Sequence, residues 1–192
     1  MKKKVVLAVL CGGLLLLGGF TTLTQVNFLD YQRPVPYNKI NEITFKNFRG
    51  LEFFQNSLYG NERFAYINTS ITYEFDGDSV SVESFFHPSS SYVYNKKAFS
   101  RDLLTHELYH FKIAELHARI AKKKISEARP GSQSEIESLI AETLREERSY
   151  QVRYDDDTFH SYVLREQKKH EREIDSLLHL YDAFKNPKII YR

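Results

Sequence analysis

The hydrophobic pattern of this 192-residue chain changes period after Ser91, and that change determines the expected fold class. Before Ser91 apolar residues alternate with polar ones, as at Ile71, Tyr73 and Phe75, which is typical of half-buried strands. After Ser91 they recur about every 3.6 residues, the period of an amphipathic helix. The chain is therefore expected to be an α+β protein, a small antiparallel β meander followed by three helices.

Turn and capping residues divide these two regions. Asp76-Gly77 predicts a hairpin turn between a strand over 64–75 and a strand that resumes at Val80. A short strand is expected to start at 43–45. The first helix should begin after the N-cap Ser100 and end before Pro130-Gly131. The second is predicted over about 134–152, and the third from after Thr158 to about 184.

The first residues have the pattern of an export signal. Lys2, Lys3 and Lys4 precede an uninterrupted run of 16 apolar or small residues, which is short for a membrane span. We expect 1–23 to be a signal peptide or, if uncleaved, an inner-membrane anchor, with no other membrane contact. A polar lead-in over 24–41 and one domain over 42–192 would follow. The domain is expected to be secreted to the periplasm or cell envelope.

Charge and cysteine content exclude two classes of protein. The chain has 27 basic and 25 acidic residues, but without the three N-terminal lysines 24 basic residues face 25 acidic ones, a net charge of −1. A nucleic-acid partner is not expected, because such binding needs a clustered positive surface. Cys11 is the single cysteine, which excludes a disulfide framework and a cysteine-based zinc site.

The motif H-E-x-x-H lies within the first predicted helix, from His106 to His110. Residues four apart are neighbours on a helix face, so both imidazoles can reach one metal ion. Glu107 lies about 100° around the helix, where it can hold an attacking water and accept its proton. The motif predicts one Zn²⁺ per chain, bound by His106 and His110, with Glu107 catalytic. A helix with two solvated histidines and an incidental glutamate is the alternative.

The rest of this helix does not supply a third ligand. The long motif H-E-x-x-H-x-x-G-x-x-H would need glycine and histidine where Ile113 and Leu116 stand. His117 lies two turns beyond His110, too far to share its metal, and is interpreted as structural or groove-lining. Glu115 points to the opposite face, where it is expected to pair with a neighbouring element.

His160 is the favoured third ligand among several downstream carboxylates and histidines. It follows an acidic turn, and we expect it near the start of the third helix, on one stripe with Leu164 and Gln167. Asp155 or Asp157 would accept its other ring N–H. His170 and His179 are expected at the surface. A glutamate of the second helix or Asp155 itself remains an alternative ligand; the glutamates considered are Glu142, Glu146 and Glu147.

Several motifs over residues 40–183 resemble those of one bacterial family. The quoted segments are Phe45-Lys46-Asn47-Phe48-Arg49-Gly50, Phe64-Ala65-Tyr66, Leu104-x-His106-Glu107-x-x-His110-Phe111 and Tyr154-Asp155-x-x-Thr158-x-His160. The family is one of unknown function, described as predicted secreted zinc-dependent proteases. The resemblance implies a zincin-like active-site helix, His160 as a ligand, and supporting or substrate-binding roles near it, for which the candidates are Tyr154, Asp155, Asp157 and Gln167. The chain departs from the family pattern at Leu108-Tyr109 and at His170.

Two functions follow as expectations. The first is a zinc-dependent peptidase of the cell envelope, whose exposed edge strand would hold a peptide or protein substrate by strand addition. The second is a non-catalytic, metal-binding interaction module of the envelope. An open coordination position beside a cleft would favour the enzyme, whereas a fourth protein ligand closing the site would favour the module.

Overall fold

The computed structural model describes residues 32–50, 64–93 and 100–191. These residues belong to one compact unit, Gln32–Arg192. The other unit, Met1–Tyr31, contains the predicted export signal and lies outside the described residues. Within the described ranges, no helix has the length and apolarity to cross a membrane.

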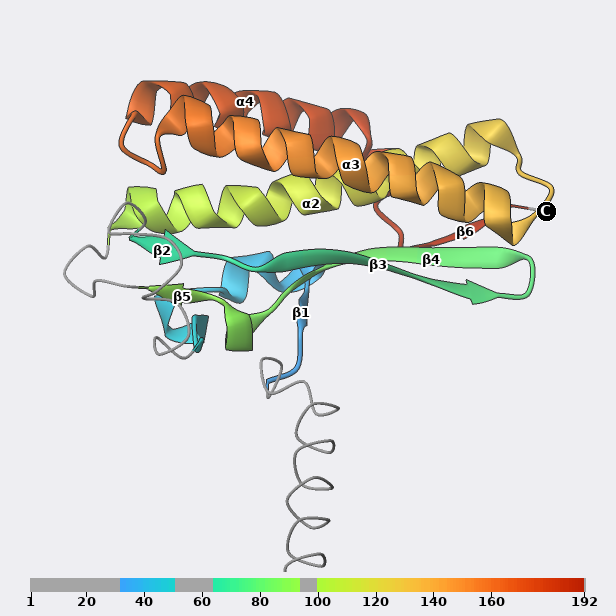
Figure 1. Cartoon of the computed structure of the whole chain (residues 1–192), viewed down its shortest axis with the longest axis horizontal. Coiled ribbons are helices and arrows are strands. Elements are labelled where there is room, and N and C mark those ends of the chain that lie inside the picture. Colours follow the sequence, from blue (N-terminus) through green and yellow to red (C-terminus); the bar gives the residue numbers. More distant parts are fainter. Residues whose placement is uncertain (1–31, 51–63, 94–99, 192) are drawn as a thin grey trace, which may run out of the picture. The chain divides into compact units, whose positions relative to one another are not determined.

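A layer of helices covers one face of an antiparallel sheet (Figure 1). The central strand of that sheet is β4 (Ser79–Phe86), paired with β3 (Thr69–Asp76) on one edge and with two short strands on the other. The two short strands are β1 (Val35–Pro36) and β6 (Lys188–Ile190). A separate pair, β2 (Ala65–Tyr66) and β5 (Tyr92–Val93), lies near the start of the first long helix (Figure 1).

The β3–β4 hairpin confirms the predicted turn. Gly77 has a φ of 59°, the left-handed conformation that glycine adopts at low cost. Val82 pairs with Tyr73 in the ladder, and Val80 with Phe75. Val80, Val82 and Phe86 alternate toward the helices and are fully buried. The α+β class, with a meander followed by three helices, is confirmed.

Two details of the predicted β region are wrong. The expected strand over 64–75 is broken at Ile67 and Asn68, between β2 and β3. The expected strand at 43–45 is replaced by a 3-10 helix, Phe45–Asn47, because Thr44 and Asn47 cap it with reciprocal side-chain bonds. The compact unit also includes part of the predicted lead-in, since β1 pairs with β4.

The three long helices are α2 (Arg101–Ala128), α3 (Gln133–Thr158) and α4 (Leu164–Leu180). The side chains of Ser100 and Ser132 accept N-cap hydrogen bonds at the starts of α2 and α3. The observed bounds of α2 confirm the predicted start after Ser100 and end before Pro130. α3 continues through Thr158 instead of ending near 152, because the segment after Tyr150 contains neither proline nor glycine to stop it.

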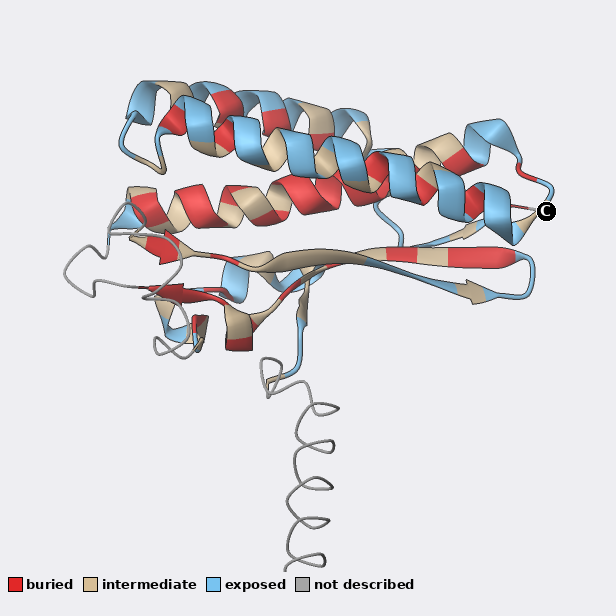
Figure 2. Cartoon of the chain, viewed as in Figure 1, coloured by how far each residue is buried: buried red, intermediate tan, exposed pale blue. Residues whose placement is uncertain are grey.

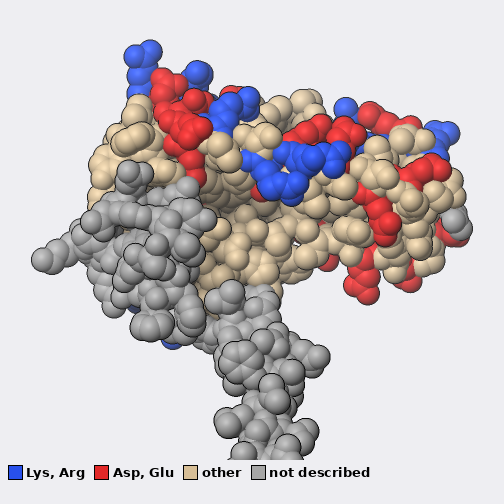
Figure 3. Space-filling model, in the orientation of Figure 1, with Lys and Arg blue, Asp and Glu red and all other residues tan. Residues whose placement is uncertain are grey.

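Packing and charge are unevenly distributed over the helices. α2 lies between the sheet and the other two helices and carries most of the buried residues (Figure 2). α3 and α4 expose charged faces, and on the face shown in Figure 3 acidic and basic side chains are interspersed over them. The motif histidines therefore lie on the most enclosed helix of the fold.

Candidate metal centre

α2 brings the two motif histidines together at the spacing of metal ligands. His106 is 1% exposed, and its Nε2 lies 3.3 Å from Nε2 of His110. Two nitrogens bound to one tetrahedral zinc at about 2.0–2.1 Å would lie roughly 3.3 Å apart. The two nitrogens therefore lie at a separation that one shared metal ion could bridge.

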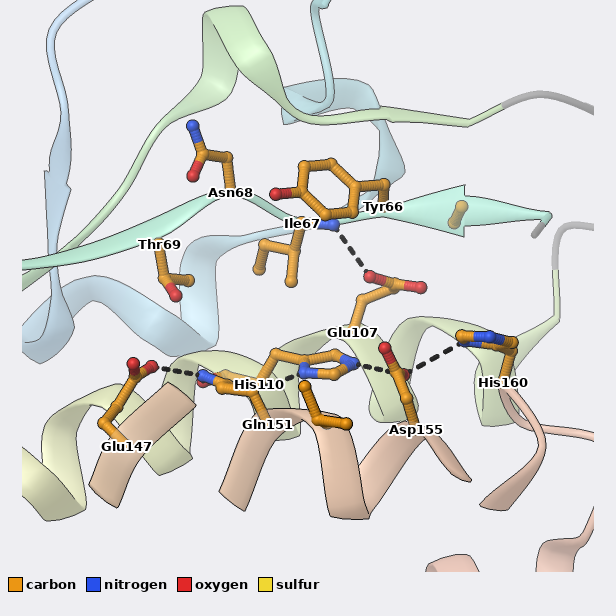
Figure 4. Close-up of a pocket in the computed structure, with 12 residues that line it drawn as sticks. Tyr66, Ile67, Asn68, Thr69, Glu107, His110, Glu147, Gln151, Asp155 and His160 are labelled. Atoms are coloured by element: carbon orange, nitrogen blue, oxygen red, sulfur yellow. Dashed lines mark hydrogen bonds and ion pairs between the residues drawn. The ribbon is translucent and has the colours of Figure 1, made fainter. Parts of the chain in front are cut away.

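Asp155, on the last turns of α3, lies at the point where three imidazoles converge. Its Oδ1 lies 3.0 Å from Nε2 of His110 and 3.1 Å from Nδ1 of His160 (Figure 4). The same oxygen lies 3.2 Å from Nε2 of His106. Ligand atoms of His106, Asp155 and His160 all lie within 4.8 Å of one another, close enough to hold a metal ion. Nitrogen and carboxylate donors of this kind suit zinc.

A strained turn presents His160 to this point. Phe159, His160 and Ser161 have φ values of 46°, 52° and 76°, a conformation that costs roughly 1 kcal/mol or more for each non-glycine residue. His160 therefore lies in the turn between α3 and α4, not at the start of the third helix. The predicted stripe with Leu164 is wrong, and Leu164 is 44% exposed. His160 reaches the centre because the chain turns back over the end of α3.

Gln151 and Glu147 support His110, and neither support was predicted. His110 Nδ1 hydrogen-bonds Oε1 of Gln151. The Gln151 amide in turn donates to the backbone oxygen of His110 at 3.0 Å and to Oε1 of Glu147 at 2.7 Å. These bonds fix the imidazole with Nε2 toward Asp155. The four-residue spacing of Glu147, Gln151 and Asp155 on one face of α3 was the available sequence signal.

Tyr154 forms the floor of the centre. It is fully buried and stacks on His106, with ring centroids 4.7 Å apart and planes 17° apart. Its ring meets His110 and His170 edge-on. His170 is buried at 4% exposure and lies 2.8 Å from Oδ2 of Asp157. The expectation of a surface His170 is therefore wrong, because Tyr154 covers it and Asp157 supplies its polar partner.

Gln167 lies behind the centre and does not line its cavity. It is fully buried and donates to the backbone oxygen of Asp102 and to Glu171. Four buried polar atoms around this region have no partner among the described residues: His106 Nδ1, Tyr154 Oη, Gln167 Oε1 and His170 Nδ1. A metal-binding imidazole normally donates its second N–H to a hydrogen-bond acceptor. His106 Nδ1 has no such acceptor among the described residues.

Glu107 lies on the other side of the centre, in a cavity of about 270 Å³. It is 4% exposed, and its Oε2 accepts a 2.8 Å hydrogen bond from the backbone N–H of Ile67, at the break between β2 and β3 (Figure 4). The cavity lies between that strand segment and α3. Its lining residues include Ala65, Tyr66, Ile67, Asn68, Thr69, Glu107, His110, Glu147, Gln151, Asp155 and His160.

Burial and mutual contact shift the pKa values of these groups. Burial lowers the pKa of His106 to about 4 and raises that of Glu107 to about 7. Burial would also lower the pKa of His110, but its hydrogen bond to the Asp155 carboxylate and that charge raise it to about 9. Although burial opposes ionisation of Asp155, bonds from the imidazoles hold its pKa far below the usual range. The Asp155 carboxylate thus favours the protonated form of His110.

The remaining predicted candidates lie outside the centre. His117 is buried, with Nδ1 2.8 Å from the backbone oxygen of Ile113. Glu115 lies on the opposite face of α2, where it accepts a hydrogen bond from Ser84 of β4 and forms an ion pair with Arg119 of α2 itself, which was not predicted. Glu142 and Glu146 both bind Lys124, and His179 is exposed.

Comparison with known proteins finds a match between part of this chain and one bacterial family. Residues 89–161 match the model of a family described as "Bacterial protein of unknown function (DUF922)". The matched residues include the H-E-x-x-H motif of α2, the face of α3 that carries Glu147, Gln151 and Asp155, and His160. Its description agrees with the family resemblance as far as an uncharacterised bacterial family and says nothing of proteolysis or zinc. No curated protein and no solved structure matches the chain.

Proposed function

We propose that this protein is a zinc-dependent peptidase. The observation that carries the proposal is the buried carboxyl group of Glu107, which lines the same cavity as His110, Asp155 and His160. A base, candidate metal ligands and an accessible space thus meet at one place, which is the arrangement that metal-assisted hydrolysis needs.

His106, His110 and His160 would hold the zinc, with Asp155 supporting them. Zinc bound there supplies a Lewis acid that polarises a carbonyl oxygen and lowers the pKa of a water. Glu107 is suited to accept and return a proton, because its carboxyl group is buried beside the candidate ligands and lines the same cavity. The N–H of Ile67 holds one carboxylate oxygen, so the orientation of the acid is fixed before substrate arrives.

The substrate class follows from the cavity wall. Five consecutive residues, 65–69, form one side of the cavity, and the Glu147, Gln151 and Asp155 face of α3 forms the other. Because residues of a strand segment form this wall, an extended peptide could lie along it. Export directed by residues 1–23 would place this activity in the periplasm or cell envelope.

A non-catalytic metal-binding module is the second candidate. The contact of Asp155 Oδ1 with three imidazoles favours it, because Asp155 would then be a fourth protein ligand. A site with four protein ligands has no position for a reacting water and stabilises structure instead. The carboxylate of Asp155 therefore decides between the two functions.

The test compares the wild type with Glu107→Gln on a peptide library, with zinc content measured on both. If the protein is a peptidase, the wild type should cleave peptides. The Glu107→Gln variant should keep its zinc but cleave at least 100-fold more slowly, because an amide cannot accept the proton. Glu142→Gln, on the exposed face of α3, is the matched control and should cleave normally.

Cobalt substitution separates the two candidates independently of turnover. An exchangeable water in the cobalt spectrum supports the peptidase. A cobalt spectrum that indicates four protein ligands and no water, together with no cleavage by the wild type, would refute the peptidase and support the non-catalytic module.

A further inference from the structure

The face of α2 opposite the candidate metal centre carries a second cluster of buried charges. Glu115, Arg119 and Lys122 lie roughly 180° around the helix from His106. They line a cavity of about 360 Å³ that shares no residue with the cavity of Glu107. Its other lining residues come from β4 and from the segments around 36–38 and 185–187.

This second cavity lies at a gap in the sheet. β1 covers the edge of β4 at Phe85 and Phe86, and β6 covers it from Ser79 to Ser81. The N–H of Val82 still donates to Pro187, at 2.9 Å. Backbone groups alternate direction along a strand, so the N–H of Ser84 is directed to the same edge as that of Val82. Ser84 thus offers a backbone donor between Pro36 and Pro187, which also line the cavity.

Glu115 and Arg119 neutralise each other. Nε of Arg119 lies 2.8 Å from Oε1 of Glu115, and Ser84 Oγ donates to the other oxygen at 2.8 Å. Arg119 also donates to the backbone oxygen of Leu178. Both side chains are buried. Both oxygens of Glu115 thus have a close partner, and Arg119 also lies 3.7 Å from Asp182.

Lys122 is a buried cation that makes no close ion pair within the described ranges, although Glu115 and Glu83 line the same cavity. It is 1% exposed, and its Nζ donates one hydrogen bond, at 3.0 Å, to the backbone oxygen of Asn186. The backbone oxygen of Asn186 is the one hydrogen-bond partner of Lys122 among the described residues. Burying a charge without a close partner is unfavourable. The Lys122 ammonium group has two further N–H donors, which an anion could accept.

We propose that this cavity binds a small oxyanion, a phosphate or carboxylate group. Lys122 would hold it from below, Lys185 would attract it at the mouth, and Ser84 and Asn38 offer further donors in the wall. Lys185 is already tied to Asp182 at 3.0 Å, so Lys122 supplies the main charge. Burial lowers the pKa of Lys122 to about 8, and a bound anion would oppose that shift.

The experiment is calorimetric titration of the whole protein with inorganic phosphate and, separately, with succinate, at constant ionic strength set by sodium chloride. We expect saturable binding with a Kd of about 1 mM or below for at least one probe, and the stronger probe identifies the oxyanion class. Lys122→Met should weaken that binding at least tenfold. Lys123→Met is the matched control, because the neighbouring Lys123 is 39% exposed and pairs with Glu127; it should bind as the wild type does.

A second variant tests the same cavity at an exposed residue. Lys185 is 58% exposed, so Lys185→Met should fold normally and weaken binding several-fold. The proposal is overturned if neither probe binds at 10 mM, or if both cavity variants bind as tightly as the Lys123 control. Zinc content and peptide cleavage play no part in this test, so its outcome is independent of the proposed peptidase.

Discussion

The two faces of α2 bury polar groups in different ways. On one face, His106 and His110 point with Asp155 and His160 toward a single place, where their ring nitrogens meet one carboxylate oxygen. On the other, Glu115 and Arg119 satisfy each other along the helix at 2.8 Å. Ligand atoms that converge on one point indicate a metal site, whereas Glu115 and Arg119 are partners of each other. Four predictions test this contrast.

The largest effect is expected on the convergent face. His106→Ala should reduce zinc affinity by at least 1,000-fold, because it removes one of the few ligands that a zinc site contains. Metal analysis after dialysis against a weak chelator measures the loss. Arg119→Met, on the opposite face, should retain full zinc. Equal zinc content in the His106 variant and the wild type would contradict the assignment.

The second prediction ranks the two side chains that compete for the third ligand position. His160→Ala should weaken zinc binding at least 1,000-fold if His160 is a ligand, whereas Asp155→Asn should weaken it about 10–100-fold if Asp155 only supports the imidazoles. Competition with a coloured zinc chelator gives both affinities. The reverse order would make Asp155 the ligand and would favour the non-catalytic module.

The third prediction concerns the paired face. Arg119→Met should lower the free energy of unfolding by about 3 kcal/mol, because it leaves the Glu115 carboxylate buried without its cation. Urea unfolding measures this loss. The double variant Glu115→Met/Arg119→Met should lose less than the single one, since no buried charge remains. A larger loss in the double variant would mean that the pair is worth more than its burial costs.

The smallest effect is a pH dependence at Lys122. The pKa of this lysine falls from 10.5 to about 8 on folding, because burial disfavours its charged form. Below pH 8 the cost of burying the charge is present in full, and between pH 8 and 10.5 it shrinks because the folded state loses the proton first. Lys122→Met should therefore be about 1–2 kcal/mol more stable than the wild type near pH 7 in chloride buffer, and this difference should vanish toward pH 10.5. A constant difference across this range would show that Lys122 is not desolvated.

Local patterns were reliable where the physical cause was also local. The hairpin at Asp76-Gly77 formed as predicted because glycine accepts the φ of 59° that this turn needs. α2 formed as predicted because Ser100 caps it and Pro130-Gly131 follows its end. The i, i+4 spacing of His106 and His110 likewise follows from helix geometry alone.

Patterns failed where a distant contact decided the outcome. His170 has charged neighbours along the chain, which predicted a surface residue, yet Tyr154 covers it from another helix. The role of Gln151 was equally hidden, since its bond to His110 joins residues 41 apart in the sequence.

The amino-acid sequence by itself determined the α+β order of the elements, the helix that carries the H-E-x-x-H motif, and the place of Glu115 on the opposite face of that helix. Each of these depends on periods and caps that act within a few residues. Only the tertiary structure decided that Asp155 meets three imidazoles and that His160 reaches them from a strained turn. Those contacts depend on how α3 packs along α2 and on where the chain turns back, which no local period specifies.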